Sequence, residues 1–228
     1  LPGILTAGAV QTMMNIYRVR PGKKAVVLGS GNVGLIVAYQ LLQAGVEVAA
    51  VVEKKEKIGG YGVHAAKLTR AGVPVITSAT VTKAEGSDCL RSVTVEKDGT
   101  ETVIECDTLC IAAGMSPMSE LLWQAGAEFD YEAELGGFVP VHDCCMKTSV
   151  PGIYVAGDAA GVEEAPIAME EGIIAGIYVA ESLGKLEKSV SDAARDEAAK
   201  RIAALESGEN GELRKAARYA QMAAMKSC

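Results

Sequence analysis

The sequence lacks an excess of positive charge: 22 lysine and arginine residues face 29 aspartate and glutamate residues, and the net charge is −7. A surface that binds nucleic acid or anionic lipid needs the opposite balance, so we expect neither partner. No uninterrupted apolar run approaches the roughly 20 residues that span a bilayer, and the first ten residues contain no lysine or arginine. We therefore expect no membrane span, no signal peptide and a cytoplasmic location.

Paired cysteine motifs are also absent. The six cysteines include no C-x-x-C pair, and their spacing is not that of a small disulfide-rich domain. We therefore expect reduced thiols, with Cys106 and Cys110 buried in a strand as small hydrophobic residues. The run HDCC at 142–145 is too compact for a tetrahedral metal site on one segment and indicates a loop. No metal site is predicted.

Regular alternation of strand and helix patterns marks the first half of the chain and predicts an α/β fold with a Rossmann-like parallel sheet. The expected strands are 24–29, 47–53, 73–77 and 108–114, and the expected helices are 32–44 and about 61–71. Three β-rich runs between 79 and 107, with Asp98-Gly99 as a turn, predict an antiparallel meander.

The chain as a whole, with 228 residues of which 49% are hydrophobic, is expected to form four parts. These are a connecting helix at 1–20, a nucleotide-binding domain at 21–114, a partial domain at 115–184 and a helical tail at 185–228. The partial domain is expected to contain a strand at 152–158, a helix at about 166–183, and Trp123 in its core. This part is too small to bury itself as a whole domain. Because the chain opens on Leu1-Pro2, as if inside a fold already in progress, we expect it to be a fragment of a longer protein.

A glycine-rich turn follows the first strand of the nucleotide-binding part. The spacing G-x-G-x-x-G lies between a strand and a helix, and an acidic residue ends the next strand, as in dinucleotide-binding sites. In such sites the glycines permit a tight turn, close approach of the pyrophosphate and close helix packing, while the helix N-terminus supplies N–H groups. The predicted cofactor-binding residues are Gly29, Gly31, Asn32, Val33, Gly34 and Glu53.

The identity of the dinucleotide follows from Glu53 only in part. A carboxylate there accepts hydrogen bonds from the adenosine ribose and repels the 2′-phosphate of NADP, so NAD is favoured over NADP. Lys54, Lys55 and Lys57 weaken that preference, and FAD could occupy such a turn as well. The alternative interpretation makes Glu53 a surface carboxylate beside a solvated loop.

A second motif, TSVPGIYVAGD at 148–158, places a carboxylate after an apolar strand. Here the chain resembles the pyridine nucleotide-disulfide oxidoreductase superfamily, whose members bind two dinucleotides. The resemblance implies that Asp158 binds the FAD ribitol, that Gly157 makes room for it, and that IAAGMSP at 111–117 is the crossing between the NAD and FAD domains. Ala113 stands where the family usually has threonine, and Ala113 and Gly114 are assigned to the cofactor site.

The sequence is most similar to the large FAD-dependent subunits of hydrogen cyanide synthase, opine and sarcosine oxidases and dye-linked amino-acid dehydrogenases. LPGILTAGAVQTMMN, LGGFVPVH and the two cofactor motifs occur in the order of that subgroup, over residues 1 to 184. The resemblance implies a fold with a complete NAD-type site and only the carboxyl-terminal half of an FAD site, since one G-x-G-x-x-G is present. FAD is therefore expected in the full-length parent.

The functional hypothesis is a fragment of an FAD- and NAD-dependent oxidoreductase that moves electrons between a flavin and either a nicotinamide or an amine or amino-acid substrate. Expected partners are a small-molecule substrate and a partner subunit or electron carrier. Two alternatives stay open: a nucleotide-binding or subunit-docking module without catalysis, and an NADH-dependent disulfide or electron-carrier reductase. No residue is assigned a catalytic role.

Overall fold

The computed structural model describes residues 1–206 and 215–218, and the chain divides into two compact units, Leu1–Gly114 and Met115–Cys228. The boundary between them falls at Gly114, the end of the segment that the sequence assigned to the nucleotide-binding domain. No helix in the described residues has both the length and the apolar character to cross a membrane.

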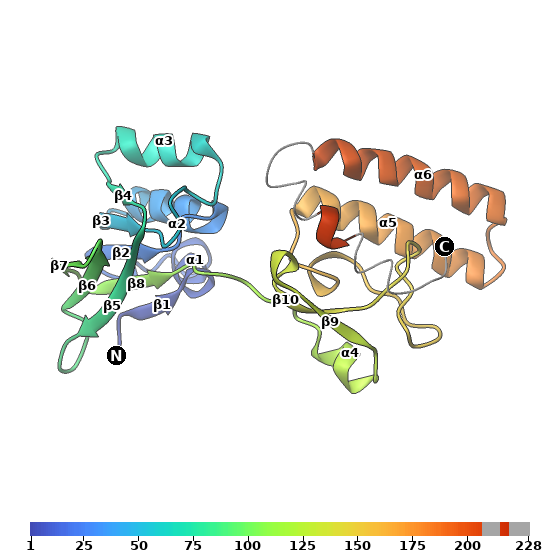
Figure 1. Ribbon diagram of the computed structural model, residues 1–228, viewed down its shortest axis with the longest axis horizontal. Helices are drawn as coiled ribbons and strands as arrows, with labels where there is room; N and C mark the ends of the chain where they lie inside the picture. Colours follow the sequence, from blue (N-terminus) through green and yellow to red (C-terminus); the bar gives the residue numbers. More distant parts are fainter. Residues whose placement is uncertain (207–214, 219–228) are drawn as a thin grey trace. The chain divides into compact units, whose positions relative to one another are not determined.

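Unit 1 is built on a five-stranded sheet in which every neighbouring pair is parallel (Figure 1). The strand order is β1-β8-β2-β3-β4. The strands are β1 (Ile4–Thr6), β2 (Lys24–Leu28), β3 (Glu47–Val52), β4 (Val75–Ile76) and β8 (Thr108–Ile111), and the helices are α1 (Ala7–Asn15), α2 (Asn32–Gln43) and α3 (Gly62–Arg70).

Two cores lie on opposite faces of this sheet. Val27 faces the helices and packs with Leu35 and Leu41 of α2, whereas its neighbour Val26 packs against the meander residue Val93. This alternation is what a strand buried on both faces requires, since successive side chains point to opposite sides. The meander consists of β5 (Ala79–Glu85), β6 (Ser92–Lys97) and β7 (Thr100–Glu105). The predicted fold class, a Rossmann-like parallel sheet with an antiparallel meander, is confirmed.

The turn between β6 and β7 confirms the Asp98-Gly99 prediction. Both residues have positive φ, 51° and 75°, as a two-residue hairpin turn requires. The amino-terminal segment differs from expectation, because a short strand, β1, precedes helix α1. Ile4, Leu5 and Thr6 pair with β8, so the sheet edge overrides the local helical pattern.

Unit 2 contains a small hairpin and two long helices. Its elements are α4 (Glu120–Gln124), β9 (Phe129–Glu132), a 3₁₀ turn η1 (Ala133–Leu135), β10 (Gly137–Pro140), a 3₁₀ turn η2 (Gly157–Ala159), α5 (Ala165–Ser182) and α6 (Lys188–Leu205). Helices α5 and α6 lie side by side (Figure 1), and Ile174 and Tyr178 of α5 pack with Ala198 of α6. The hydroxyl of Tyr178 also donates to Asp192, 3.0 Å away.

Helix α6 occupies the first part of the segment that the sequence predicts to be a helical tail. The remainder of that prediction, at 207–214 and 219–228, lies outside the described residues.

Two expectations for unit 2 are wrong. Residues 152–158 do not form a strand. Among the described residues, Tyr154 makes only an isolated bridge to Lys147, and a strand requires a longer series of hydrogen bonds to a neighbouring segment. Trp123 is not a core residue, since half of its surface (51%) is exposed. The tryptophan instead packs on the hairpin as part of an aromatic cluster on the surface.

Two predictions about the cysteines are confirmed and one is wrong. Residues 142–145 form a loop with a turn, as expected. Cys106 and Cys110 are buried free thiols on opposite faces of the sheet, and burial raises the pKa of each, to about 11 and about 12. Cys144 is disulfide-bonded, so the expectation of a reduced thiol is wrong there. Within the described ranges, no group of three or more metal-ligating side chains is gathered.

Candidate functional site

The glycine-rich turn lies at the carboxyl end of β2, beside the carboxyl end of β8. The chain leaves β2 toward β3 on one side, while β8 and β1 lie on the other, so the strand order reverses between β2 and β8. Open α/β sheets bind ligands at such a reversal. The amide of Ala112 donates to the carbonyl of Leu28 at 2.7 Å, which holds the residues after β8 against the turn.

Two glycines of the fingerprint are required by the fold itself. Gly29 has φ of +105°, and a Cβ there would lie 2.4 Å from the carbonyl oxygen of Ala112. A Cβ at Gly34 would lie 2.1 Å from the carbonyl oxygen of Gly29. No side chain fits at either distance, so these glycines allow the turn and the close packing of α2 on β2.

Gly31 has no such structural requirement. Its φ of −63° and ψ of 171° suit any residue, and a Cβ at Gly31 would meet no described atom within 4 Å. The open space lies at the N-terminus of α2, directly beside Gly31 as the N-cap residue. A glycine that neither backbone conformation nor packing demands is expected where a ligand must approach the backbone closely.

The N-terminus of α2 is equipped to hold an anion. No side chain of the described residues caps this helix, and its first turn contains no acidic residue. The N–H groups of Asn32 and Val33 lie in that turn, where the helix dipole favours negative charge. The side chain of Asn32 serves a different purpose, because its Oδ1 accepts from the amide of Tyr61 at 2.8 Å.

Glu53, at the end of β3, is joined to the turn by a residue that the sequence analysis missed. Its Oε2 accepts from both the amide and the hydroxyl of Ser30, at 2.8 and 2.6 Å, and its Oε1 accepts from the amide of Lys55 at 2.9 Å. Ser30 is fully buried. These three bonds use part of the acceptor capacity of the carboxylate and leave room for a further donor.

The charge of Glu53 follows from the same contacts. Partial burial alone would raise its pKa, but the hydrogen bonds from Lys55 and Ser30 outweigh that effect and lower the pKa below the ordinary glutamate value. The side chain is therefore ionised at neutral pH. Lys54, Lys55 and Lys57 are exposed around it, as a solvated loop would be.

Gly59 and Gly60, which the sequence analysis also missed, pack against the glycine-rich turn at Ser30. The amide of Gly60 donates to the carbonyl of Ser30 at 2.9 Å, and that of Gly59 donates to the Ser30 hydroxyl at 3.1 Å. A Cβ at Gly60 would lie 2.7 Å from the amide nitrogen of Asn32. Gly31, Gly59 and Gly60 thus form a cradle without side chains at the N-terminus of α2. The Gly59-Gly60 dipeptide, in the loop between the strand at 47–53 and the following helix, was the available sequence signal.

Ala113 and Gly114, predicted at the crossing, follow β8 at the same edge of the sheet. Both are exposed, and the amide nitrogen of Ala113 lies 3.2 Å from the position that a Cβ on Gly29 would take. Gly114 has φ of +112°, which favours glycine. The structure therefore brings the predicted residues of unit 1 together around one turn.

Gly157 and Asp158 lie in unit 2, in the 3₁₀ turn η2 ahead of α5. Gly157 is buried with φ of +67°, and its amide donates to Oε2 of Glu171 at 2.8 Å. Asp158 is exposed, and its Oδ1 accepts from the amide of Glu163 at 3.2 Å. Its other oxygen is available to a polyol hydroxyl.

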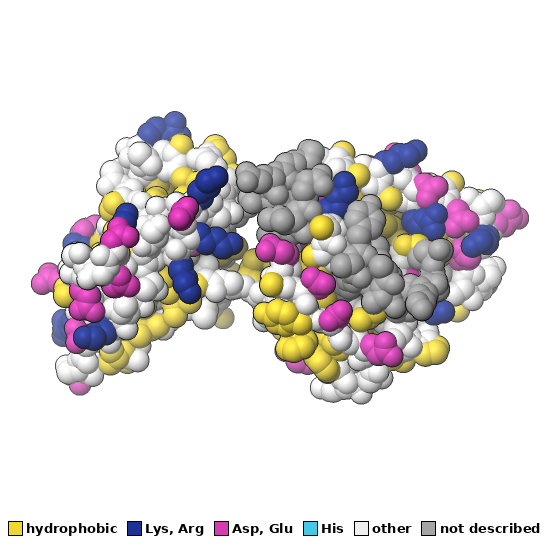
Figure 2. Space-filling view, viewed as in Figure 1, with side chains coloured by type: hydrophobic (Ala, Val, Ile, Leu, Met, Phe, Trp, Pro, Cys, Tyr) yellow, Lys and Arg dark blue, Asp and Glu magenta, His cyan; other side chains and the backbone are white. Residues whose placement is uncertain are grey.

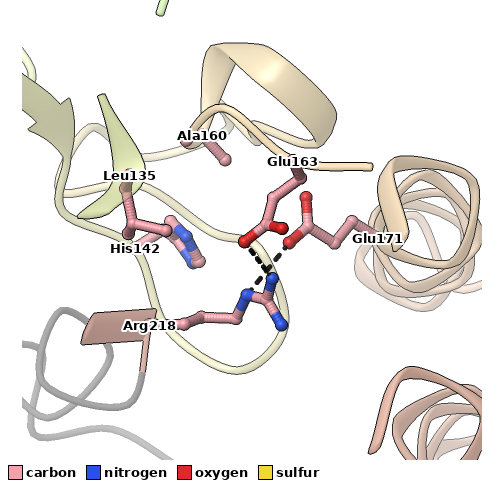
Figure 3. A pocket seen from close by; sticks show the side chains of 7 residues that line it. Leu135, His142, Ala160, Glu163, Glu171 and Arg218 are labelled. Carbon is pink, nitrogen blue, oxygen red and sulfur yellow. Dashed lines mark hydrogen bonds and ion pairs between the residues drawn. The ribbon is translucent and has the colours of Figure 1, made fainter. Parts of the chain in front are cut away.

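A buried ion cluster lies directly behind this turn (Figure 3). The guanidinium of Arg218 points between the carboxylates of Glu163 and Glu171. It also contacts Glu206, with a nitrogen-to-oxygen distance of 2.6 Å. Among the described residues, Arg218 therefore contacts three carboxylates that are nearly inaccessible to solvent, and Lys215 also attracts Glu206. His142 lines the same pocket, and burial lowers its pKa.

The burial of Glu171 predicts an unusual pH dependence of stability. Burial raises the pKa of Glu171 to about 7, against the attraction of Arg218 and the bond from Gly157. The folded state then binds a proton that the unfolded state releases near pH 4.5, so stability falls as pH rises from about 4.5 to about 7. Glu171→Gln is expected to remove this loss, and urea unfolding at about pH 5 and about pH 8 measures it.

The neighbouring Glu170 supplies a matched control. Its hydrogen bond to Arg201 lowers its pKa, so Glu170→Gln is expected to reduce stability at neutral pH or leave it unchanged. Glu171→Gln should instead be more stable than the original chain at the higher pH and equal to it at the lower one. A Glu171→Gln chain that is less stable than the original chain at the higher pH would contradict the interpretation that burial raises the pKa of Glu171.

Comparison with known proteins agrees with the fold and the motifs. The family model described as pyridine nucleotide-disulphide oxidoreductase matches residues 2–172. The match covers the glycine turn, the meander, the crossing after β8 and Gly157-Asp158. The chain belongs to the pyridine nucleotide-disulphide oxidoreductase family, a family of enzymes.

Individual relatives include the kinds of protein that the sequence pattern indicated. The alpha chain of sarcosine oxidase from Rhizobium meliloti is 27% identical over 80% of this chain and 17% of its own length. One of the opine oxidase subunits, from Agrobacterium tumefaciens, is 28% identical over 78% of this chain and 39% of its own length. The chain therefore spans less than half the length of these relatives.

The solved structure of T. acidophilum thioredoxin reductase shares the fold. The TM-score is 0.68 at 24% identity, with 79% of this chain and 58% of that chain covered. At this identity the likeness concerns the fold alone. The resemblance inferred from the sequence motifs is confirmed at the level of the family.

Proposed function

We propose that unit 1 binds the pyrophosphate of NAD at the N-terminus of α2, as part of an oxidoreductase that uses NAD and FAD. The observation that carries this proposal is the open space at Gly31, where a glycine is needed by neither φ nor packing. An anion seated there would meet the N–H groups of Asn32 and Val33 and the positive end of the helix dipole.

Each predicted residue has a separate task in this proposal. Gly29 and Gly34 set the turn, while Glu53, fixed by Ser30, accepts a ribose hydroxyl with its remaining acceptor site. At Gly60, a Cβ would come within 2.7 Å of the amide nitrogen of Asn32, so glycine keeps a side chain away from that amide. When bound, the nicotinamide would supply hydride transfer, and the protein residues would hold and orient it.

The flavin assignment extends the proposal to unit 2. Asp158 is exposed next to a tight turn, and Gly157 carries no side chain that would obstruct a ligand. We assign Asp158 to the ribitol of FAD in a longer parent protein. The substrate there would be an amine or amino acid, as the names of the sarcosine and opine oxidase relatives suggest, and a partner subunit or electron carrier would accept the electrons. A cytoplasmic location remains a prediction from the sequence.

The choice of NAD over NADP is tested at Glu53. In calorimetric titrations of the chain, NADH is expected to bind at least about tenfold more tightly than NADPH, because the ionised carboxylate repels the 2′-phosphate. Glu53→Gln keeps an oxygen that can accept from Ser30 but removes the charge, so it should narrow this difference severalfold.

A nearby carboxylate serves as the control for that titration. Glu56 is exposed on the same loop, and Glu56→Gln should leave the NADH-to-NADPH ratio unchanged. Equal affinities of the original chain for NADH and NADPH would refute the assignment of Glu53. Loss of all binding in Glu53→Gln with an intact fold would instead show that its charge is required for the turn.

A further inference from the structure

Unit 2 exposes a cluster of aromatic rings on the hairpin and on α4. Trp123 stacks on Phe129 with ring centroids 3.7 Å apart and planes 3° apart. Phe138 meets Trp123 edge to face at 6.1 Å and Tyr131 edge to face at 5.3 Å. We call Trp123, Phe129, Tyr131 and Phe138 the aromatic patch.

The patch is unusual for this chain. It contains both phenylalanines and the only tryptophan of the 228 residues. These rings are absent from the cores of the described residues, and Trp123, Tyr131 and Phe138 are 51%, 60% and 58% exposed. Rings that already contact one another and remain half in water typify protein interfaces, whose centres are enriched in tryptophan, tyrosine and phenylalanine.

The surroundings of the patch are acidic. Residues 115–140 contain no lysine, arginine or histidine, and their charged residues are Glu120, Glu128, Asp130, Glu132 and Glu134. Glu120 lies three residues before Trp123 on α4 and therefore on the same side of that helix, whereas Asp130 and Glu132 alternate along β9 with Phe129 and Tyr131 and point to the other face of the hairpin. Figure 2 shows hydrophobic side chains gathered over β9 and β10, with acidic side chains beside them.

The charge around the patch decides which occupant fits. A second copy of the chain in a symmetric contact would bring the same acidic residues against themselves, and like charges across an interface are costly. A protein surface with an apolar centre and surrounding lysines or arginines matches both features. We propose that the aromatic patch is the docking surface for a partner protein of that kind.

Ring geometry explains how the patch would bind. Trp123 and Phe129 are already held in place by their stacking within unit 2. Binding a partner would therefore cost these side chains little further conformational entropy. Such rings act as anchors, while acidic residues around them select the partner and accelerate encounter. The sarcosine and opine oxidase relatives are named as subunits, which is consistent with a partner.

Trp123 makes the proposal measurable, because its fluorescence is the sole tryptophan signal of the chain. The probe is a synthetic amphipathic helix with a leucine face flanked by lysines, and its twin has glutamate in place of lysine. On adding the lysine helix to the full 228-residue chain, Trp123 emission should shift to shorter wavelength and become protected from acrylamide. The glutamate twin should cause neither change.

A matched pair of tyrosines locates the binding. Tyr131→Ser is expected to weaken the lysine helix about tenfold, as removal of an interface anchor does. Tyr17→Ser removes a tyrosine that is 70% exposed in unit 1 and should leave the affinity unchanged. Both positions are exposed, so both variants are expected to fold, and circular dichroism verifies this.

Three outcomes would overturn the proposal. They are equal binding of the two helices, binding of the lysine helix without a change at Trp123, and equal weakening by both tyrosine variants. Sedimentation velocity adds a fourth: self-association of the chain that Tyr131→Ser abolishes would identify a second copy as the occupant. None of these measurements involves NADH, so they succeed or fail independently of the nucleotide site.

Discussion

Gly31→Ala is expected to lower the affinity for NADH by at least about tenfold while leaving the fold unchanged. The added methyl group meets open space in the protein, but it would occupy the place where we propose that the pyrophosphate approaches the backbone. Losing one charge-assisted hydrogen bond to a phosphate costs roughly 1.5–3 kcal/mol, and about 1.4 kcal/mol is a factor of ten. Gly31→Asp adds charge repulsion and should abolish binding. Titration followed by NADH fluorescence measures both variants.

Gly34 provides the contrasting control. A methyl group there would lie 2.1 Å from the carbonyl oxygen of Gly29, so α2 must move away from β2. Gly34→Ala should therefore lower the free energy of unfolding by about 1–3 kcal/mol or more. Gly31→Ala should leave that free energy nearly unchanged. If Gly31→Ala binds NADH as tightly as the original chain, the fingerprint has been assigned the wrong role.

The 228-residue chain is expected to purify without flavin. Asp158 and the turn at Gly157 would contact the ribitol, but the sequence contains a single G-x-G-x-x-G, which we assign to NAD. The ADP moiety of FAD would then lack its pyrophosphate and ribose contacts. Several charge-assisted hydrogen bonds of roughly 1.5–3 kcal/mol each correspond to several powers of ten in affinity.

The absorbance spectrum after desalting tests the flavin prediction. A longer parent chain with a second glycine fingerprint should retain flavin absorbance, and Asp158→Ala in that parent should reduce it. Glu134→Ala, which removes an exposed carboxylate in the same unit, should have no effect. Stoichiometric FAD on the 228-residue chain would show instead that the fingerprint at Gly29 binds flavin.

The parts of unit 1 that could be predicted from the sequence are those encoded locally. Gly29 is favoured by its own positive φ, Gly34 by its contact with Gly29 five residues earlier, and the turn at Asp98-Gly99 by its own two φ angles. The continuous apolar run at 25–28 of β2 indicates burial on both faces of the sheet. Such features are fully contained in short stretches of sequence.

Contacts between distant residues could not be predicted in this way. Ser30 reaches Glu53 across 23 positions, and Arg218 reaches Glu163 across 55, without any local pattern that links them. The run at 152–158 is apolar like a strand, but strand formation depends on neighbours that its own residues do not specify. The sequence predicts Trp123 in the core, whereas it stacks on Phe129 with half of its surface exposed.

Amide hydrogen exchange of the chain with and without NADH tests the proposed nucleotide site most directly, because it reports where the nucleotide binds. We expect NADH to slow exchange at residues 29–34 and at Gly59 and Gly60, and to leave residues 157–163 of unit 2 unchanged. In Gly31→Asp this protection should disappear. Protection confined to unit 2, or none at residues 29–34 under saturating NADH, would contradict the assignment of the glycine turn to NAD.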